Sequence, residues 1–135
     1  MPTRVFVDTN VLVYAFTADA QKGARAEAVM AERPWVSVQG LNELTHVLRR
    51  KRKLDWARIT DISDTVSALS EVVDLNLACH QRALRLVRRY ALGWWDALQL
   101  AVALETEARE FLSEDLQHGQ LFEGRLRVCN PFLAD

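Results

Sequence analysis

Short apolar segments alternate with helical patterns along all 135 residues, and this alternation constrains the fold more than any other feature. The predicted strands are residues 4–7, 34–38, 72–73, 110–113 and 126–129. The predicted helices are residues 11–16, 21–32, 41–48, 59–69, 79–87 and 97–104. Strands separated by helices favour parallel pairing, because a parallel connection must cross back over the sheet. We therefore expect an α/β fold, a three-layer α/β/α sandwich with a central parallel sheet, formed by a single domain over residues 1–135.

The composition is typical of a soluble globular protein: 50% of the residues are apolar and 26% are charged. No apolar run reaches the roughly 20 residues of a membrane-spanning helix, and Asp8 interrupts the run that a secretory signal would need. Cys79 and Cys129 lack the spacing of a zinc site or a disulfide framework, which favours a reducing cytoplasm. The net charge of −1 lacks the basic bias of many nucleic-acid binders, so such a partner would be held by local patches.

An acidic residue, Asp8, interrupts the otherwise apolar stretch VFVDTNVLV near the N-terminus. A buried carboxylate costs several kcal/mol unless it is paired, hydrogen-bonded or bound to a cation. Two explanations are open. Asp8 could cap the helix that follows, as Asp-Thr-Asn sequences do. It could instead lie at the carboxyl end of a buried strand, where open α/β sheets bind their ligands.

Three further acids occupy comparable places in the pattern. Glu43 and Asp96 lie in the first turns of predicted helices, and Asp115 follows the strand that ends at Ser113. Taken one at a time, each has a simple explanation, because acids in a first turn complement the helix dipole and Ser-Glu-Asp sequences form turns. In a parallel sheet, however, all four acids would meet at the carboxyl edge and repel one another unless a cation neutralised them. Such an all-oxygen ligand set predicts Mg²⁺ or Mn²⁺ rather than zinc.

The sequence resembles the PIN-domain family, and within it the VapC-like toxin ribonucleases, in the blocks VFVDTNVLVYAF, NELTHVLRR, WWDALQLAVA and FLSEDLQHGQ. The closing RVCNPF is similar to the end of one PIN subgroup. This resemblance implies an α/β/α sandwich and a divalent-metal-dependent endoribonuclease. By this resemblance the acidic site consists of Asp8, Glu43, Asp96 and Asp115. Thr9 and Asn10 match the small polar residues that support the first acid.

The chemistry that follows is hydrolysis of a phosphodiester by activated water. A Mg²⁺ or Mn²⁺ ion would be held mainly by Asp8 and Asp96, with Asp115 and Glu43 binding directly or through water. Glu43 is the candidate for orienting or deprotonating that water. His46, one turn further along, could assist, although a lone helical histidine is more often structural.

Local basic patches are the candidate RNA contacts. The run Arg49, Arg50, Lys51, Arg52 and Lys53 could hold phosphates, or it could only complement the end of a helix dipole. The arginines of the 79–89 segment are expected to form a solvated face. The tryptophans at 94 and 95 could stack on bases, but beside a buried helix they are expected to be core.

The toxin resemblance implies RNA as the substrate and a cognate antitoxin protein that restrains the enzyme in the cytoplasm. The helix after Asp8 is the expected contact surface, because Val11, Leu12, Tyr14 and Phe16 cannot all face one core. An apolar patch there also leads us to expect a homodimer of the isolated protein. Burial of this helix under residues 21–32 is the alternative.

Other functions are open on the sequence alone. A haloacid-dehalogenase-type phosphohydrolase would carry a second Asp where this chain has Asn10, and a response-regulator receiver would need a lysine later than Lys53. A PIN nuclease of RNA processing that is not a toxin is a third possibility. A PIN-like binding module without activity is the fourth.

Overall fold

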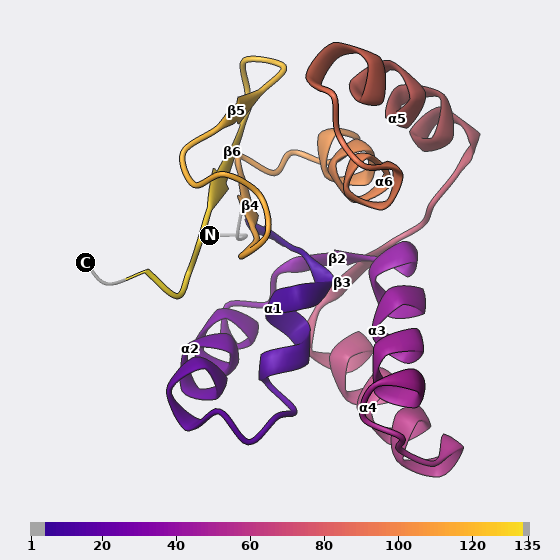
Figure 1. Cartoon of the computed structure of the whole chain (residues 1–135), viewed down its shortest axis with the longest axis vertical. Coiled ribbons are helices and arrows are strands. Elements are labelled where there is room, and N and C mark those ends of the chain that lie inside the picture. Colours follow the sequence, from indigo (N-terminus) through magenta and orange to yellow (C-terminus); the bar gives the residue numbers. More distant parts are fainter. Residues whose placement is uncertain (1–4, 134–135) are drawn as a thin grey trace.

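The computed structural model describes residues 5–133 (Figure 1). The strands are β1 (Val5–Val7), β2 (Trp35–Ser37), β3 (Glu71–Val73), β4 (Glu110–Leu112), β5 (Leu121–Phe122) and β6 (Leu126–Cys129). The helices are α1 (Thr9–Tyr14), α2 (Ala20–Ala31), α3 (Val38–Arg50), α4 (Trp56–Leu69), α5 (Leu77–Tyr90) and α6 (Trp94–Leu104). The part of the first predicted strand that falls on Arg4 lies outside the described residues.

The strands form one six-stranded sheet in the order β3-β2-β1-β4-β6-β5. All neighbours pair in parallel except β5, which runs antiparallel to β6. The predicted α/β fold with a parallel central sheet is therefore confirmed. The sequence pattern does not reveal β5, because a strand of two residues is too short to show a periodicity of two.

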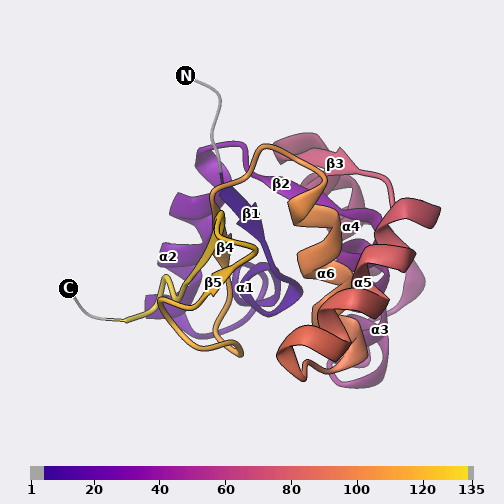
Figure 2. The same ribbon diagram turned by 90° about the horizontal axis from the view of Figure 1, so that it is seen from above.

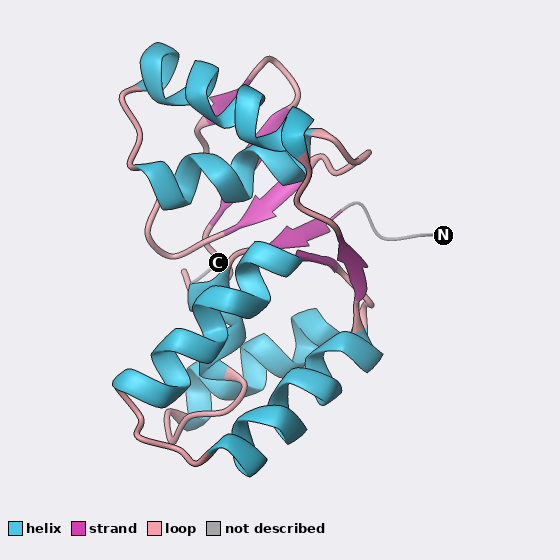
Figure 3. Cartoon of the chain, turned by 90° about the vertical axis from the view of Figure 1, so that its right-hand side faces the viewer, coloured by secondary structure: helices cyan, strands magenta, loops and turns pink. Residues whose placement is uncertain are grey.

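Helices cover both faces of the sheet. In Figure 1, α5 and α6 lie above β1, β2 and β3 and level with β5 and β6, whereas α1 to α4 lie toward the bottom; Figure 3 shows the same two groups of helices from the side. Side-chain alternation along β1 explains the two cores: Phe6 packs with Phe111 and the α5–α6 side chains, whereas Val7 packs with Leu112 and the α1–α4 side chains. The paired register of Phe6 with Phe111, whose rings stack 5.6 Å apart, continues this division across the sheet.

Helix α6 lies between α5 and the sheet (Figure 2), which explains its apolar sequence. Every residue from Ala97 to Leu104 is buried, as predicted. The same position makes Gln99, a polar residue of this helix, as inaccessible as its apolar neighbours, with 1% of its surface exposed.

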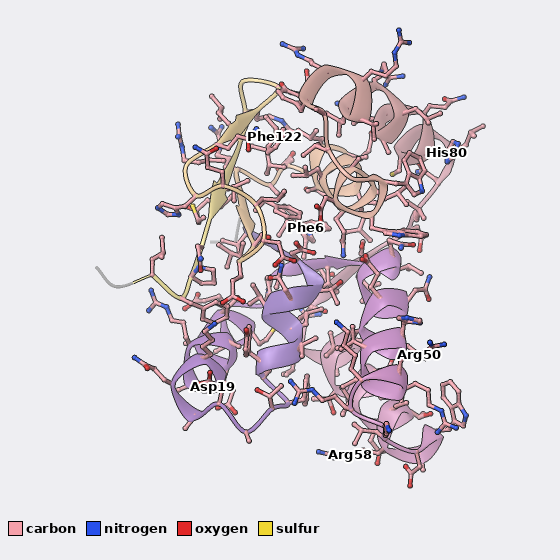
Figure 4. All side chains as sticks on the ribbon, in the orientation of Figure 1. Phe6, Asp19, Arg50, Arg58, His80 and Phe122 are labelled. Carbon is pink, nitrogen blue, oxygen red and sulfur yellow. The ribbon has the colours of Figure 1, made fainter. Side chains whose placement is uncertain are left out.

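Two details of the predicted helices are wrong. Ser37 caps α3 by accepting a hydrogen bond from the Gly40 amide, so α3 begins at Val38 and Glu43 lies in its second turn, not its first. The periodicity of residues 79–87 predicts a buried stripe of Cys79, His80, Ala83, Leu84 and Val87. On α5, Cys79 and Ala83 are indeed buried, but Leu86 is the third buried residue, and His80 and Leu84 are exposed. Figure 4 shows Phe6 and Phe122 in the interior, and Arg50, Arg58 and His80 at the periphery.

The expected apolar contact surface on α1 is absent. Val11 and Leu12 are each 1% exposed, and Tyr14 and Phe16 are partly buried against the core below the sheet. The Tyr14 ring also meets the Phe132 ring edge-on at 5.0 Å. These side chains are therefore buried, because α2 and the segment after β6 both cover α1. Within residues 5–133, no helix is long and apolar enough to cross a membrane.

Candidate functional site

The four acids singled out from the sequence line one pocket, of about 380 Å³, at the carboxyl ends of β1 and β4. Asp8 directly follows β1, and Asp115 lies three residues after the end of β4. Glu43 reaches the pocket from α3, and Asp96 reaches it from the first turn of α6. Four segments that are distant in sequence therefore supply carboxylates to one place, while their chemical roles stay predictions.

Asp8 is the most enclosed of the four acids, with 5% of its surface exposed. Its Oδ1 accepts a hydrogen bond from the Thr9 amide at 2.8 Å, so it does cap α1. Its Oδ2 accepts one from the Ser113 hydroxyl at 2.9 Å. Burial raises the pKa of Asp8 to about 7, the hydrogen bonds from Ser113 and Thr9 oppose the rise, and the charges of Asp96 and Glu43 add to it. Both explanations offered for Asp8 are therefore realised at once.

The predicted supporting residues hold Asp8 in place. Asn10 donates from Nδ2 to Asp8 Oδ2 and to Ser113 Oγ, both at 3.2 Å, and its Oδ1 accepts from the Glu114 amide. Thr9 donates from its hydroxyl to the Gly40 carbonyl oxygen at 3.3 Å. These bonds connect the β1–α1 turn to the turn after β4 and to the start of α3, the three segments that carry Asp8, Asp115 and Glu43.

Ser113 was not among the residues singled out from the sequence. Its hydroxyl donates to Asp8 and accepts from the amide of Asp115 at 3.1 Å, so one side chain orients the first acid and shapes the turn that carries the fourth. The available signal was its position, since a serine directly at the end of a buried strand, followed by Glu-Asp, faces the same sheet edge as Asp8.

Gln99 is the second residue that sequence reasoning missed. Its Nε2 donates to Thr9 Oγ1 at 2.9 Å and to Glu43 Oε2 at 3.1 Å, and its Oε1 accepts from the Ser37 hydroxyl at 2.7 Å. A Cβ at Gly40 would come within 3.1 Å of Gln99 Nε2, so glycine lets α3 approach this amide closely. The signal was the single polar residue in the otherwise apolar stretch of residues 97–104, which must find partners when it is buried.

The remaining acids are less enclosed. Burial raises the pKa of Glu43 to about 6, and the hydrogen bond from Gln99 opposes that rise while the charge of Asp96 adds to it. Burial also raises the pKa of Asp96, with a further contribution from the charge of Asp115. Asp115 itself is exposed. The protonated forms of three of the four acids are thus favoured relative to free carboxyl groups, mainly because the side chains are buried and to a lesser extent because acids lie near one another.

Glu114 adjoins Asp115 in the sequence but is occupied elsewhere. It forms an ion pair with Lys22 of α2 and accepts a hydrogen bond from the Tyr14 hydroxyl at 2.9 Å. The Lys22 hydrogen bond holds the pKa of Glu114 below its usual value. Of the two acids after β4, Asp115 is therefore the one available in the pocket.

The donor set fits a hard divalent cation. All candidate ligands are carboxylate oxygens, and neighbouring acids contribute to the raised pKa values of Asp8, Glu43 and Asp96. A cation bound among these carboxylates would offset that repulsion. Among residues 5–133, no group of three or more Asp, Glu, His or Cys side chains is placed to hold a metal ion as it stands. The all-oxygen donor set itself suits Mg²⁺ or Mn²⁺ better than it suits zinc.

The basic run contributes two side chains to the same pocket. Lys51 and Arg52 follow the end of α3 and line the pocket with the acids. Arg49 instead donates to the Leu54 carbonyl oxygen and lies 4.9 Å from the Trp56 ring. Arg50 and Lys53 are exposed outside the pocket lining.

The other candidate RNA contacts are divided by the structure. Arg82 and Arg89 of α5 pair with Glu105 and Glu123, which agrees with the expected solvated face. Trp94 packs beside the upper core, as expected, with the His80 ring edge-on at 5.3 Å. Trp95 does not, because 59% of its surface is exposed. Outside the acidic pocket, His118 accepts a hydrogen bond from the Asn130 amide.

Solved structures of similar fold were found by comparison. A toxin–antitoxin complex from Klebsiella pneumoniae matches with a TM-score of 0.72 and 18% identity, covering 94% of this chain and 97% of that one. VapC20 of Mycobacterium tuberculosis, a Sarcin-Ricin loop cleaving toxin, matches with a TM-score of 0.62 and 19% identity, over 79% of this chain and 86% of that one. VapBC2 from Rickettsia felis, bound to a promoter DNA fragment, matches with a TM-score of 0.68 and 16% identity, over 93% and 98%.

No curated protein sequence matches this chain significantly. The model of the PIN domain, in contrast, matches residues 5–121, which include all four acids. The resemblance to the PIN-domain family is thereby confirmed by the family model, and the solved structures, all below 20% identity, share the fold. From the match over most of its length and from its fold, the chain belongs to the PIN domain family.

Proposed function

We propose that this protein is a divalent-metal-dependent endoribonuclease and the toxin of a toxin–antitoxin pair. The observation that carries the proposal is one pocket that contains four carboxylates and, at its edge, Lys51 and Arg52. The carboxylates suit a divalent cation, and the two basic side chains suit the phosphates of a polyanionic substrate.

The residues that would hold a Mg²⁺ or Mn²⁺ ion are Asp8 and Asp96, with Asp115 and Glu43 binding directly or through water. When bound, such an ion lowers the pKa of a water ligand and offsets negative charge on the scissile phosphate. The protein's contribution is to fix the ligands: the Thr9 amide and the Ser113 hydroxyl both orient the Asp8 carboxylate before any cation arrives.

Glu43 is the candidate general base. Its pKa of about 6 is raised by burial toward the range in which a carboxylate accepts a proton from water efficiently near neutral pH. Gln99 donates to Glu43 Oε2 and so restricts the rotation of the carboxylate. In this role Glu43 takes the proton of the attacking water, and the phosphodiester bond is cleaved by the resulting nucleophile.

Metal-dependent cleavage of a mixed RNA pool tests the nuclease. Purified wild-type protein is expected to cleave RNA with Mg²⁺ or Mn²⁺ and not with EDTA, and Asp8→Asn is expected to be inactive. Asp61→Asn, which changes an exposed acid on α4, is the matched control and should cleave normally. Equal cleavage by wild type and Asp8→Asn would exclude the proposed site.

The toxin role, acting on RNA in the cytoplasm, is supported by the fold shared with a toxin–antitoxin complex and with VapBC2. We include an antitoxin protein as partner and a homodimer as the form of the isolated chain, both through a surface other than the apolar face of α1, which is buried. Light scattering of the purified protein measures whether the isolated chain is a homodimer. Expression of the chain alone in cells measures its toxicity. If cells that express active wild-type enzyme grow as well as cells that express Asp8→Asn, the toxin role is excluded and a housekeeping nuclease is the alternative.

A further inference from the structure

A second pocket, of about 360 Å³, adjoins the acidic one. Glu43 and Val47 line both pockets, so the two are continuous across one face of α3. The remaining lining comes from α3 and from the first turn of α6: Gln39, Asn42, His46 and Trp95. The α3 members are spaced by three or four residues, which places them on one side of the helix, opposite the indole.

The lining residues restrict what this second pocket can bind. It contains no lysine or arginine, so it lacks the groups that hold a phosphate. Its single carboxylate, Glu43, already accepts a hydrogen bond from Gln99, so it lacks the ligands of a second cation. What it does offer is the exposed face of an indole, the side of Val47, and the amide and imidazole groups of Asn42 and His46.

Those groups match an uncharged, flat ligand with polar edges. A nucleobase has this shape, stacks on aromatic side chains and presents donors and acceptors at its edge. The position supports the same ligand, because a nucleotide whose phosphate lies among the acids and Lys51 would direct its base along the shared α3 face.

We propose that the pocket between Trp95 and α3 is a subsite for one unpaired base of the RNA strand whose phosphate occupies the acidic pocket. The inference rests on the proposed nuclease function and adds to it a base-binding subsite formed by residues of this chain, in which one base is unstacked from its neighbours. Trp95 supplies the stacking surface, and Asn42 and His46 supply edge contacts that discriminate between bases.

Binding of short RNAs to the Asp8→Asn protein, measured by fluorescence anisotropy with Mg²⁺ present, tests the subsite. The probes are an unstructured RNA oligomer that wild type cleaves and the same oligomer with an abasic nucleotide at each position in turn. We expect one position near the cleavage site to lose affinity about tenfold when abasic. In Asp8→Asn combined with Trp95→Ala, the intact oligomer should bind about tenfold more weakly and the abasic penalty should vanish.

Trp56→Ala is the matched control, since Trp56 is also exposed, at 57%, but lies on α4 outside this pocket. The abasic penalty should persist in that variant. Trp95→Phe should retain part of it, which separates loss of stacking from loss of folding. Circular dichroism and thermal melting of each variant establish that it is folded.

The outcomes separate this inference from the proposed function. If wild type neither binds nor cleaves RNA, the nuclease proposal fails. If wild type cleaves RNA but the abasic penalty survives Trp95→Ala, the nuclease stands and the base subsite is overturned. If Trp95→Ala leaves RNA binding unchanged but alters the oligomeric state in light scattering, the pocket is a protein contact and the inference is also overturned.

Discussion

The side-chain amide of Gln99 donates to Glu43 Oε2 at 3.1 Å, although the two residues belong to different helices. The same nitrogen donates to Thr9 Oγ1, next to Asp8. One buried amide therefore couples the candidate general base to the segment that carries the most enclosed acid. Among residues 5–133, no buried side-chain nitrogen or oxygen lacks a hydrogen-bond partner, so this polar network inside the fold is complete.

The first prediction concerns Gln99→Met, which keeps the volume and removes the hydrogen bonds. Because Gln99 lowers the pKa of Glu43, its loss should move the acidic limb of the pH–kcat/KM profile to higher pH. We also expect kcat to fall about tenfold, and unfolding free energy to fall by about 1–3 kcal/mol as Ser37 and Thr9 lose their buried partner.

Gln81→Met, at an exposed position of α5, is the control and should behave as wild type in both measurements. A purely structural Gln99 would lower stability without moving the pH profile. That result, or a profile shifted to lower pH, would contradict the positioning role.

The second prediction concerns stability against pH without metal. The folded-state pKa of Asp8, about 7, lies above its unfolded value of 3.8, so folding favours the protonated form. This stabilisation is complete below about pH 4 and is lost as pH rises through 7. A shift of about three units corresponds to roughly 4 kcal/mol at most. Glu43 contributes in the same direction, between its ordinary pKa of 4.5 and about 6.

Urea unfolding in EDTA at pH 5 and at pH 8 measures the effect. Wild type should lose more stability between these pH values than Asp8→Asn, whose amide cannot ionise. Asp61→Asn should keep the wild-type dependence. Identical dependence in wild type and Asp8→Asn would show that Asp8 does not ionise in this range.

The third prediction concerns metal binding. Asp96→Ala should stabilise the fold in EDTA, because it removes a like charge from a crowded pocket. Asp8→Ala should keep the fold, since the same relief offsets the lost α1 cap and Ser113 hydrogen bond. Wild type should gain about 2.7 kcal/mol when Mg²⁺ is raised to about 100 times its Kd, and the variants should gain much less. Thermal melts with and without Mg²⁺ measure the difference, and an equal gain in wild type and Asp8→Ala would show that the ion binds elsewhere.

The sequence predicts the sheet and the four acids because both follow from local patterns. Asp8 and Asp115 come after apolar strands, and parallel pairing brings strand ends together. Gln99 could not be placed in the same way, since its partners lie 56 to 90 residues away and only the packing of α6 against β2 and α3 brings them close. The exposure of the two tryptophans could not be predicted either. Trp94 and Trp95 are adjacent in the sequence, yet the orientation of α6 packs Trp94 against the core and exposes Trp95.

The α1 helix shows the opposite limit. Its apolar residues form a free surface only if nothing else covers them, and α2 and the segment after β6 both cover them. The Tyr14–Phe132 contact joins residues 118 positions apart by number, beyond the reach of any periodicity. Amphipathic patterns identify which face is apolar, whereas the identity of the covering segment depends on the whole topology.

The last prediction concerns Lys51 and Arg52, which line the acidic pocket while Arg85 and Arg88 lie on α5. In the described part of the chain, neither Lys51 nor Arg52 has an acidic side chain within salt-bridge distance, so both are available to phosphates. The double variant Lys51→Ala with Arg52→Ala should raise KM for single-stranded RNA about tenfold and leave kcat nearly unchanged, because groups that hold phosphates bind substrate and transition state alike. The slope of log affinity against log salt should also become less negative by about 0.7 for each phosphate that the variant no longer neutralises.

Arg85→Ala with Arg88→Ala removes the same charge from the remote surface and should change neither the KM nor the salt dependence appreciably. Equal effects of the two double variants would mean that RNA is attracted by overall charge, and the assignment of Lys51 and Arg52 to the scissile strand would then be wrong.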